Sequence, residues 1–152
     1  AKWFEVITWP RGLAMSGDMG SWVFRREQDM FEFFRHPCID PDYWHEKLEA
    51  VDRHGAQEFD ADVFRADALA HLDNWALDES KLAAARADLA ENLNPCDTEE
   101  ELRQAWADSE VNGEPLDPCD MPSGMIYTRR FLWACHAIRW AVEQYDALEA
   151  KP

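Results

Sequence analysis

The chain has 152 residues, 47% of them apolar, which is enough for one sizeable core, so we predict a single domain over residues 1–152. Its 31 acidic residues outnumber its 15 basic residues, and the resulting negative field disfavours direct binding to nucleic acid. The sequence has no run of about 18 or more apolar residues and no signal-peptide pattern, so we expect a cytoplasmic protein with no membrane partner.

The first part of the chain is predicted to form three strands. Residues 3–9 are aromatic, β-branched or otherwise apolar except for Glu5, which is typical of a strand. The stretch Trp9-Pro10-Arg11-Gly12 predicts a turn, because proline suits the second position of a type I turn and glycine the fourth. Short strands are expected over residues 13–16 and 21–25. Together they predict an antiparallel β-meander over residues 1–26.

The remaining residues, 27–152, are predicted to form a multi-helix body. A short apolar helix near residues 30–34 ends before Pro37, since the residue preceding a proline avoids the helical region. Asp40 is expected to cap a second helix, which Gly55 ends.

Three further helices are expected before the C-terminal part of the chain. Asp60 is a predicted cap for the first, and an alanine-rich helix follows from about residue 80 to 93. Thr98 and Glu101 form a capping box for the third, which we expect to end near residues 112–113.

The C-terminal segment has the strongest helical pattern. Apolar side chains repeat at steps of three and four through Phe131, Cys135, Ile138, Val142 and Tyr145. This pattern predicts a long core helix over residues 127–150. The fold class is therefore predicted to be α+β, with a small N-terminal antiparallel meander packed on a multi-helix body.

Several segments at both ends of the chain resemble a family of small, uncharacterised proteins of tailed phages and prophages. The quoted segments are Val6-Ile7-Thr8-Trp9-Pro10, Ser16-Gly17-Asp18-Met19-Gly20, Val23-Phe24, residues 29–35, residues 39–47 around Tyr43-Trp44, residues 131–138, Trp140 and Gln144-Tyr145-Asp146. The resemblance implies a phage origin, a similar fold and action within an infected bacterial host, and it implies no catalytic residues. Members of the family typically carry additional sequence before the Trp-Pro turn.

The stretch Gly17-Asp18-Met19-Gly20 allows two interpretations. Asp18 could bind a metal or orient a water, and backbone amides near the glycines could hold an anion. The same residues between two short strands are an ordinary hairpin signal, and the segment lacks the lysine and helix of a phosphate-binding loop. We favour the turn.

Histidines and cysteines give weak signals for chemistry. The four cysteines, Cys38, Cys96, Cys119 and Cys135, lack the paired spacing of a zinc site. Cys38, His36, Asp40, Asp42 and His45 lie close in sequence and could hold a metal, although the prolines among them favour a connection between helices. No arrangement of a nucleophile with a base is apparent. We therefore predict no enzyme, no cofactor and no metal.

The most informative feature is the charge of the central segment. Residues 58–120 contain 18 acidic residues against four basic ones, which gives this segment a charge of −14 out of −16. Such a field attracts proteins with basic surfaces. An acidic composition can also serve only to keep a surface solvated. The predicted partner-binding residues are Asp60, Asp67, Asp73, Trp75, Asp78, Glu79, Asp88, Glu91, Asp97, Glu99, Glu100, Glu101, Trp106, Asp108 and Glu110, with Trp75 and Trp106 expected to be exposed anchors.

These features support three hypotheses of different classes. The first is a non-enzymatic, anti-CRISPR-like inhibitor, whose carboxylates imitate phosphates and occupy the basic nucleic-acid-binding surface of a host protein or ribonucleoprotein complex. The second is a phage accessory or assembly protein that self-associates through its aromatic surface. The third is an enzyme with Asp18, His36 and His45 at a metal. The first hypothesis requires that the acidic side chains converge on one continuous surface.

Overall fold

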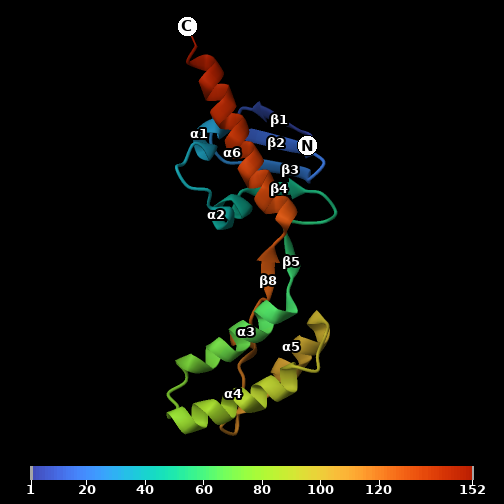
Figure 1. Ribbon diagram of the computed structural model, residues 1–152, viewed down its shortest axis with the longest axis vertical. Helices are drawn as coiled ribbons and strands as arrows, with labels where there is room; N and C mark the ends of the chain where they lie inside the picture. The colour runs from blue at the N-terminus through green and yellow to red at the C-terminus, as the bar shows by residue number, and fades with distance from the viewer. Residues whose placement is uncertain (1, 152) are drawn as a thin grey trace. The chain divides into compact units, whose positions relative to one another are not determined.

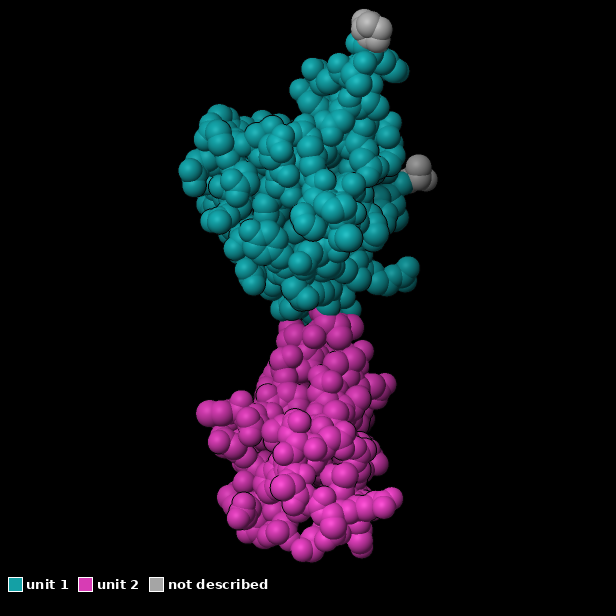
Figure 2. All heavy atoms as spheres, turned by 90° about the vertical axis from the view of Figure 1, so that its left-hand side faces the viewer, with its two compact units in different colours: residues 1–58, 127–152 teal, residues 59–126 magenta. Residues whose placement is uncertain are grey.

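The computed structural model describes residues 2–151 and contains two compact units. Unit 1 combines residues 1–58 with residues 127–152, and unit 2 is the continuous segment 59–126 (Figure 2). Each unit encloses its own cluster of buried apolar side chains, and the two clusters share no residue. The structure thus has two buried clusters where we expected one core, because the apolar side chains of the middle helices pack on one another.

Unit 1 is built on an antiparallel sheet with the strand order β1-β2-β3-β4 (Figure 1). The strands are β1 (Phe4–Trp9), β2 (Gly12–Gly17), β3 (Gly20–Arg25) and β4 (Leu48–Val51). The first three form the predicted meander, which is confirmed. Both hairpins have two-residue loops: Pro10-Arg11 joins β1 to β2, with Arg11 at a φ of 70°, and Asp18-Met19 joins β2 to β3.

The segment from Gly17 to Gly20 is a hairpin turn, as the favoured interpretation predicted. Gly17 and Gly20 are cross-strand partners. A Cβ at Gly17 would lie 2.3 Å from the backbone oxygen of Trp3, and Gly20 adopts a φ of +111° that side chains rarely allow. The carboxylate of Asp18 accepts a hydrogen bond from the backbone N–H of Trp3 at 2.9 Å. This hydrogen bond therefore connects the turn to the residue that precedes β1.

The fourth strand was not predicted. The helix that begins after the cap Asp40 is α2 (Pro41–Glu46), and it ends well before Gly55. The next residues form β4 and pair with β3, with a bulge between Val23 and Phe24. In the helix that we expected from residue 40 to 55, the backbone groups of these residues would bond within the helix. In the structure they bond to β3 instead.

Three helices cover one face of this sheet. They are α1 (Met30–Phe34), α2 and α6 (Arg129–Glu149), and α6 lies across the strands (Figure 1). The buried cluster of unit 1 joins sheet residues such as Trp22 and Phe24 to Phe131 and Ile138 of α6. The long C-terminal helix is thus confirmed as a core element, capped by Thr128, which accepts from the N–H of Phe131.

Unit 2 is mainly helical. Its elements are α3 (Ala61–His71), the 3-10 helix η1 (Leu72–Asn74), α4 (Glu79–Leu93), α5 (Glu99–Ala107), β6 (Glu110–Val111), β7 (Glu114–Pro115) and the 3-10 helix η2 (Pro118–Asp120). The predicted cap Asp60 and the capping box of Thr98 with Glu101 are confirmed. The strands β5 (Gln57–Phe59) and β8 (Met125–Tyr127) form a two-stranded sheet through which the chain enters and leaves this unit.

One helix of unit 2 ends earlier than predicted. The helix that begins at the capping box ends at Ala107, whereas we expected it to continue to Asn112-Gly113. Asn112 and Gly113 have φ values of 54° and 81° and connect β6 to β7. Positive φ at both central residues is the requirement of a two-residue hairpin turn, and Asn-Gly satisfies it readily. The sequence signal was therefore a hairpin turn and not the end of a helix.

We expect the Asp146→Asn variant to lose part of the acid sensitivity of unit 1. Arg35 donates from Nε and Nη2 to the two carboxylate oxygens of Asp146 at 3.0 and 2.8 Å, which joins α1 to α6 and lowers the pKa of the Asp146 carboxyl. A carboxyl whose pKa is lower in the folded state stabilises the fold above its unfolded pKa, and this contribution is lost as the pH falls through the folded pKa.

This expectation is checked by urea unfolding of unit 1 at neutral pH and at a pH below the usual range for aspartate. The stability difference between wild type and Asp146→Asn should shrink toward zero in acid. The control Glu143→Gln removes a carboxylate that pairs with Arg139 on the surface of the same helix, at 2.8 Å, and should keep the wild-type pH dependence. An Asp146→Asn difference that is constant with pH would contradict the expectation.

Candidate functional site

The predicted partner-binding residues all lie in unit 2. This unit holds 17 acidic and four basic residues, a charge of −13, whereas unit 1 holds 14 acidic and 11 basic residues, a charge of −3. Each of the predicted carboxylate residues is exposed except Asp60, which is half-buried. The negative charge of the chain is therefore concentrated in one compact unit.

Some of these carboxylates have partners inside the unit. Asp60, Asp78 and Glu101 accept hydrogen bonds from backbone N–H groups at the starts of α3, α4 and α5. Asp73 pairs with Arg86, and Glu99 pairs with Arg103 at 2.8 Å. The three capping carboxylates stabilise the starts of these helices, because a carboxylate interacts favourably with the N-terminal end of the helix dipole. Their structural roles limit how far each could be changed without loss of stability.

A second set of carboxylates has no such partner. Within residues 2–151 the structure gives neither a side-chain hydrogen bond nor an ion pair to the carboxylates of Asp67, Glu79, Asp88, Glu91, Asp97, Glu100 and Glu110. The side chain of Asp108 accepts a hydrogen bond from Gln104 at 2.9 Å and stays exposed. The unpaired carboxylates keep their full charge available for a partner.

Two groups of the acidic side chains lie close together in the structure. Glu100, Glu101 and Asp108 line a shallow hollow of about 540 Å³ along α5. Asp88 of α4 and Glu110 of β6 line a second hollow of about 160 Å³. The other carboxylates, such as Asp67 on α3, line neither hollow. The structure thus brings together two groups from the predicted set. We use the name acidic surface for these five residues and for three further carboxylate residues on or next to α4 and α5: Asp88, Glu91, Asp97, Glu99, Glu100, Glu101, Asp108 and Glu110.

The expectation that Trp75 and Trp106 are exposed anchors is wrong. Trp106 is fully buried, its indole N–H donates to the backbone oxygen of Asp117 at 3.3 Å, and its ring packs against His71. Trp75 is half-buried against the same cluster. The polar neighbours of Trp106 suggested exposure, but Leu102 stands four residues before it, and this spacing places both side chains on the buried face of α5.

The proposed metal cluster is not brought together. Asp40 accepts from the N–H of Tyr43 at 3.0 Å, and Asp42 accepts from the hydroxyl of Tyr127 at 2.6 Å. His45 packs against the rings of Tyr127 and Phe131. Among residues 2–151, no group of three or more His, Cys, Asp or Glu side chains is arranged to hold a metal ion.

Two groups that could take part in chemistry, the buried Cys135 and the half-buried Tyr127, are held in their neutral forms. Burial raises the pKa of the Cys135 thiol to about 12. Burial and then the hydrogen bond to Asp42 raise the pKa of Tyr127 to about 12. The thiolate is the reactive form of cysteine, so Cys135 is an inert core side chain near neutral pH.

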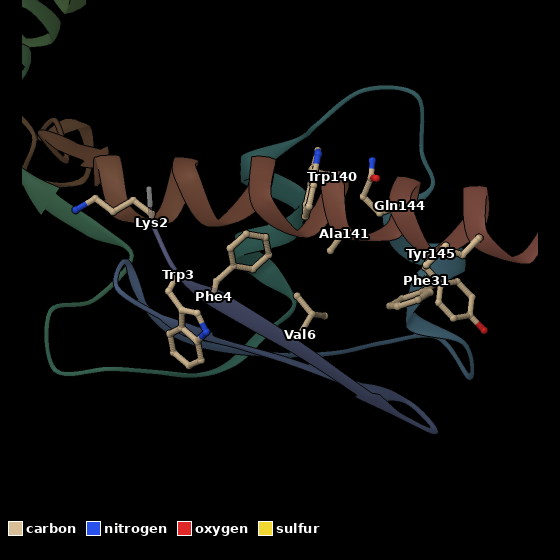
Figure 3. Close-up of a pocket in the computed structure, with 10 residues that line it drawn as sticks. Lys2, Trp3, Phe4, Val6, Phe31, Trp140, Ala141, Gln144 and Tyr145 are labelled. Carbon is tan, nitrogen blue, oxygen red and sulfur yellow. The ribbon is translucent and has the colours of Figure 1, made fainter.

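Sequence reasoning assigned no role to an apolar groove in unit 1. The groove has a volume of about 530 Å³ and lies between the start of β1 and the C-terminal half of α6 (Figure 3). We name it the aromatic groove; its lining residues are Lys2, Trp3, Phe4, Val6, Phe31, Trp140, Ala141, Gln144, Tyr145 and Leu148. The spacing of Trp140, Gln144 and Leu148 by four residues is the signal that could have indicated it.

Aromatic contacts hold the walls of the aromatic groove in place. The ring of Phe4 meets the rings of Trp133 and Trp140 edge to face, at centroid distances of 5.4 and 6.0 Å. Phe31 meets Tyr145 in the same way at 5.0 Å. Trp140 remains 55% exposed and Tyr145 47%, so the prediction that Tyr145 belongs to the core stripe is wrong. The groove offers a partner rigid aromatic side chains with much of their area still open to water.

Comparison of the chain with protein-family models, curated proteins and solved structures finds no match. None of the helices between residues 2 and 151 is both long enough and apolar enough to cross a membrane. A functional argument therefore depends on the two surfaces themselves.

Proposed function

We propose that the chain is a non-enzymatic binding protein that occupies the basic nucleic-acid-binding surface of a host protein or ribonucleoprotein complex. The observation that carries this proposal is the concentration of a charge of −13 in unit 2, against −3 in unit 1. The resemblance to proteins of tailed phages supports a bacterial host as the source of the partner, and an RNA-guided defence complex is one complex of this kind.

The spacing of charge along α5 supports imitation of a nucleic acid. Asp97, Glu99, Glu100, Glu101 and Asp108 lie on or next to α5 and span about 16 Å of helix length, so successive carboxylates are on average about 4 Å apart along the axis. Each strand of duplex DNA carries about one phosphate charge per 3.4 Å. The pairing of Glu99 with Arg103 reduces the net density somewhat. The charge density along α5 thus approaches that of one strand, which suits a groove that follows a single backbone.

The proposal predicts that removal of unpaired carboxylates slows association. The variant Asp88→Asn, Glu91→Gln, Glu100→Gln removes three charges that have no internal partner, so the fold should be unaffected. Because long-range attraction by clustered charges raises association rates by about 10-fold to 1,000-fold, we expect the association rate at low salt to fall about tenfold. The rates of wild type and variant should converge at high salt, where charges are screened.

A variant with the same change in net charge serves as the control. Glu46→Gln, Glu143→Gln and Glu149→Gln remove three exposed carboxylates from unit 1 and should leave the association rate near that of wild type. Partners are captured on the immobilised protein from nuclease-treated bacterial lysate, identified by mass spectrometry, purified and used for the rate measurements. Duplex DNA or RNA should release them. Equal rates for the two variants, or partners that nucleic acid does not release, would disprove the proposal.

A further inference from the structure

The outer edge of β1 has unpaired backbone groups. The backbone N–H of Asp18 donates to the oxygen of Trp3, so these opposite residues form a hydrogen-bonded pair. In an antiparallel ladder such pairs recur at every second residue, which places Glu5, Ile7 and Trp9 in the bonds to β2. The N–H and C=O groups of the alternate residues, Phe4, Val6 and Thr8, therefore point away from the sheet. Within residues 2–151 no strand pairs with this edge.

The two edges of the sheet differ in how they are protected from pairing. The opposite edge strand, β4, has four residues, faces a bulge and carries Glu49. β1 has six residues in continuous register with β2, and it contains no proline, no lysine and one charge, Glu5. Short length, bulges and charges are the usual protections of edge strands, and a long apolar edge without them readily accepts another strand.

We propose that β1 pairs with β1 of a second copy of this chain, in antiparallel orientation about a two-fold axis at Val6. This register places Val6 opposite Val6 and Phe4 opposite Thr8 of the second copy. Every outward-facing residue then exchanges two backbone hydrogen bonds with its opposite. Glu5 lies opposite Ile7, whereas an axis at Glu5 would place like charges against each other. The sheet thereby continues from one copy into the other.

The exposed apolar area beside this edge supplies more than half of the area that such a contact needs. Trp3 is 60% exposed, Trp140 55% and Tyr145 47%. Aromatic side chains present roughly 150–250 Å² each, so these three offer about 300 Å². Ile7 and Leu148, which are 57% and 65% exposed, add about 200 Å². A stable interface buries about 800 Å² per partner, and the paired backbone edges with their polar rim supply the remainder.

The aromatic groove extends the same contact onto α6. Trp140, Gln144 and Leu148 are spaced by four residues along this helix and line the aromatic groove. Pairing of the two β1 strands brings these residues of the two copies to the same side of the joined sheets. The second copy therefore lies next to the exposed ring of Trp140, while Trp3 and Ile7, which alternate with Phe4 and Val6 along β1, lie on the other face of the joined sheets. This contact is independent of the binding proposed for the acidic surface.

Hydrogen exchange of the wild-type protein tests the pairing directly. As the protein concentration rises, the amides of Phe4, Val6 and Thr8 should become protected by at least tenfold. The amides of Glu5 and Ile7 bond to β2 within one copy and should keep the same protection at every concentration. Protection of Phe4, Val6 and Thr8 that does not depend on concentration would overturn the proposal.

Sedimentation of variants gives a second test. Val6→Pro removes an outward N–H, which an edge strand tolerates, and Trp140→Glu places a charge in the aromatic groove. Each should weaken the dimer at least about tenfold. The control Leu132→Glu puts the same charge on α6 outside the groove, where Leu132 is 37% exposed, and should leave the dimer intact. Trp140→Glu remains informative if Val6→Pro fails to fold.

The outcomes separate this proposal from the binding of a basic partner. Added salt should leave the dimer unchanged or strengthen it, because its contact is apolar, whereas salt should release a partner held by the acidic surface. A protein that stays monomeric at all concentrations overturns the dimer, and so does a dimer that neither Val6→Pro nor Trp140→Glu weakens. If a captured protein protects the amides of Phe4, Val6 and Thr8 at every concentration, a strand of that protein occupies the edge, and the dimer is overturned.

Discussion

Replacement of Trp106 with alanine is expected to lower the free energy of unfolding of unit 2 by about 3–5 kcal/mol. The side chain is fully buried at the centre of the cluster formed by α3, α4 and α5. Its removal leaves a large cavity and also deprives the backbone oxygen of Asp117 of a hydrogen bond. A segment of this size has a small stability margin. We therefore expect unit 2 of the Trp106→Ala variant to be largely unfolded.

Native-state hydrogen exchange measures this effect separately for each unit. Amides of α4 and α5 should lose protection in Trp106→Ala, while amides of β2, β3 and α6 should retain it, because the two buried clusters share no residue. Gln104→Ala changes an exposed side chain on the same helix and should cost about 0.5 kcal/mol or less. A stable Trp106→Ala protein that loses only partner binding would restore Trp106 as a surface anchor.

The sequence predicted the structure correctly where interactions between residues close in the chain determine it. The turn at Gly17 to Gly20, the caps Asp40 and Asp60, and the capping box at Thr98 depend on residues within a few positions of one another. The α+β class and the long C-terminal helix follow from periodic apolar patterns, which are also local.

The errors came from features that depend on distant contacts. Residues 48–51 form β4 because β3 offers an unpaired edge, and nothing near them in the sequence indicates this. The division into two buried clusters depends on which apolar stripes meet in space. Trp140, Gln144 and Leu148 are spaced by four residues within one helix, but only the position of β1 beside that helix completes the aromatic groove.

The acidic surface was predicted in part. The sequence placed the excess charge in the central segment, and the structure encloses that segment in one unit. It did not reveal which carboxylates cap helices and which remain unpaired, because that depends on the ends of the helices and on the arginines that reach them. Asp73 illustrates this limit, since it pairs with Arg86 on the next helix. The unpaired set is the more informative target for mutation.

Replacement of Phe131 with alanine is expected to lower the free energy of unfolding of unit 1 by about 3–5 kcal/mol. The ring is fully buried in the first turn of α6 and lies 5.4 Å from the ring of Trp22 and 5.3 Å from that of Tyr127, measured between centroids. It therefore links the sheet to the start of the helix that forms one wall of the aromatic groove.

Loss of this link should affect the two proposed contacts differently. Leu132→Ala changes the next residue, which is 37% exposed, and should cost about 1 kcal/mol. Chemical unfolding, monitored by hydrogen exchange of the β2 and β3 amides, gives the free energy of unfolding of unit 1 in both variants. Phe131→Ala should weaken the dimer, because β1 and α6 no longer hold the groove, while the acidic surface of unit 2 should still bind its partner. Loss of partner binding in Phe131→Ala, with the amides of α4 and α5 still protected, would instead assign the partner to unit 1.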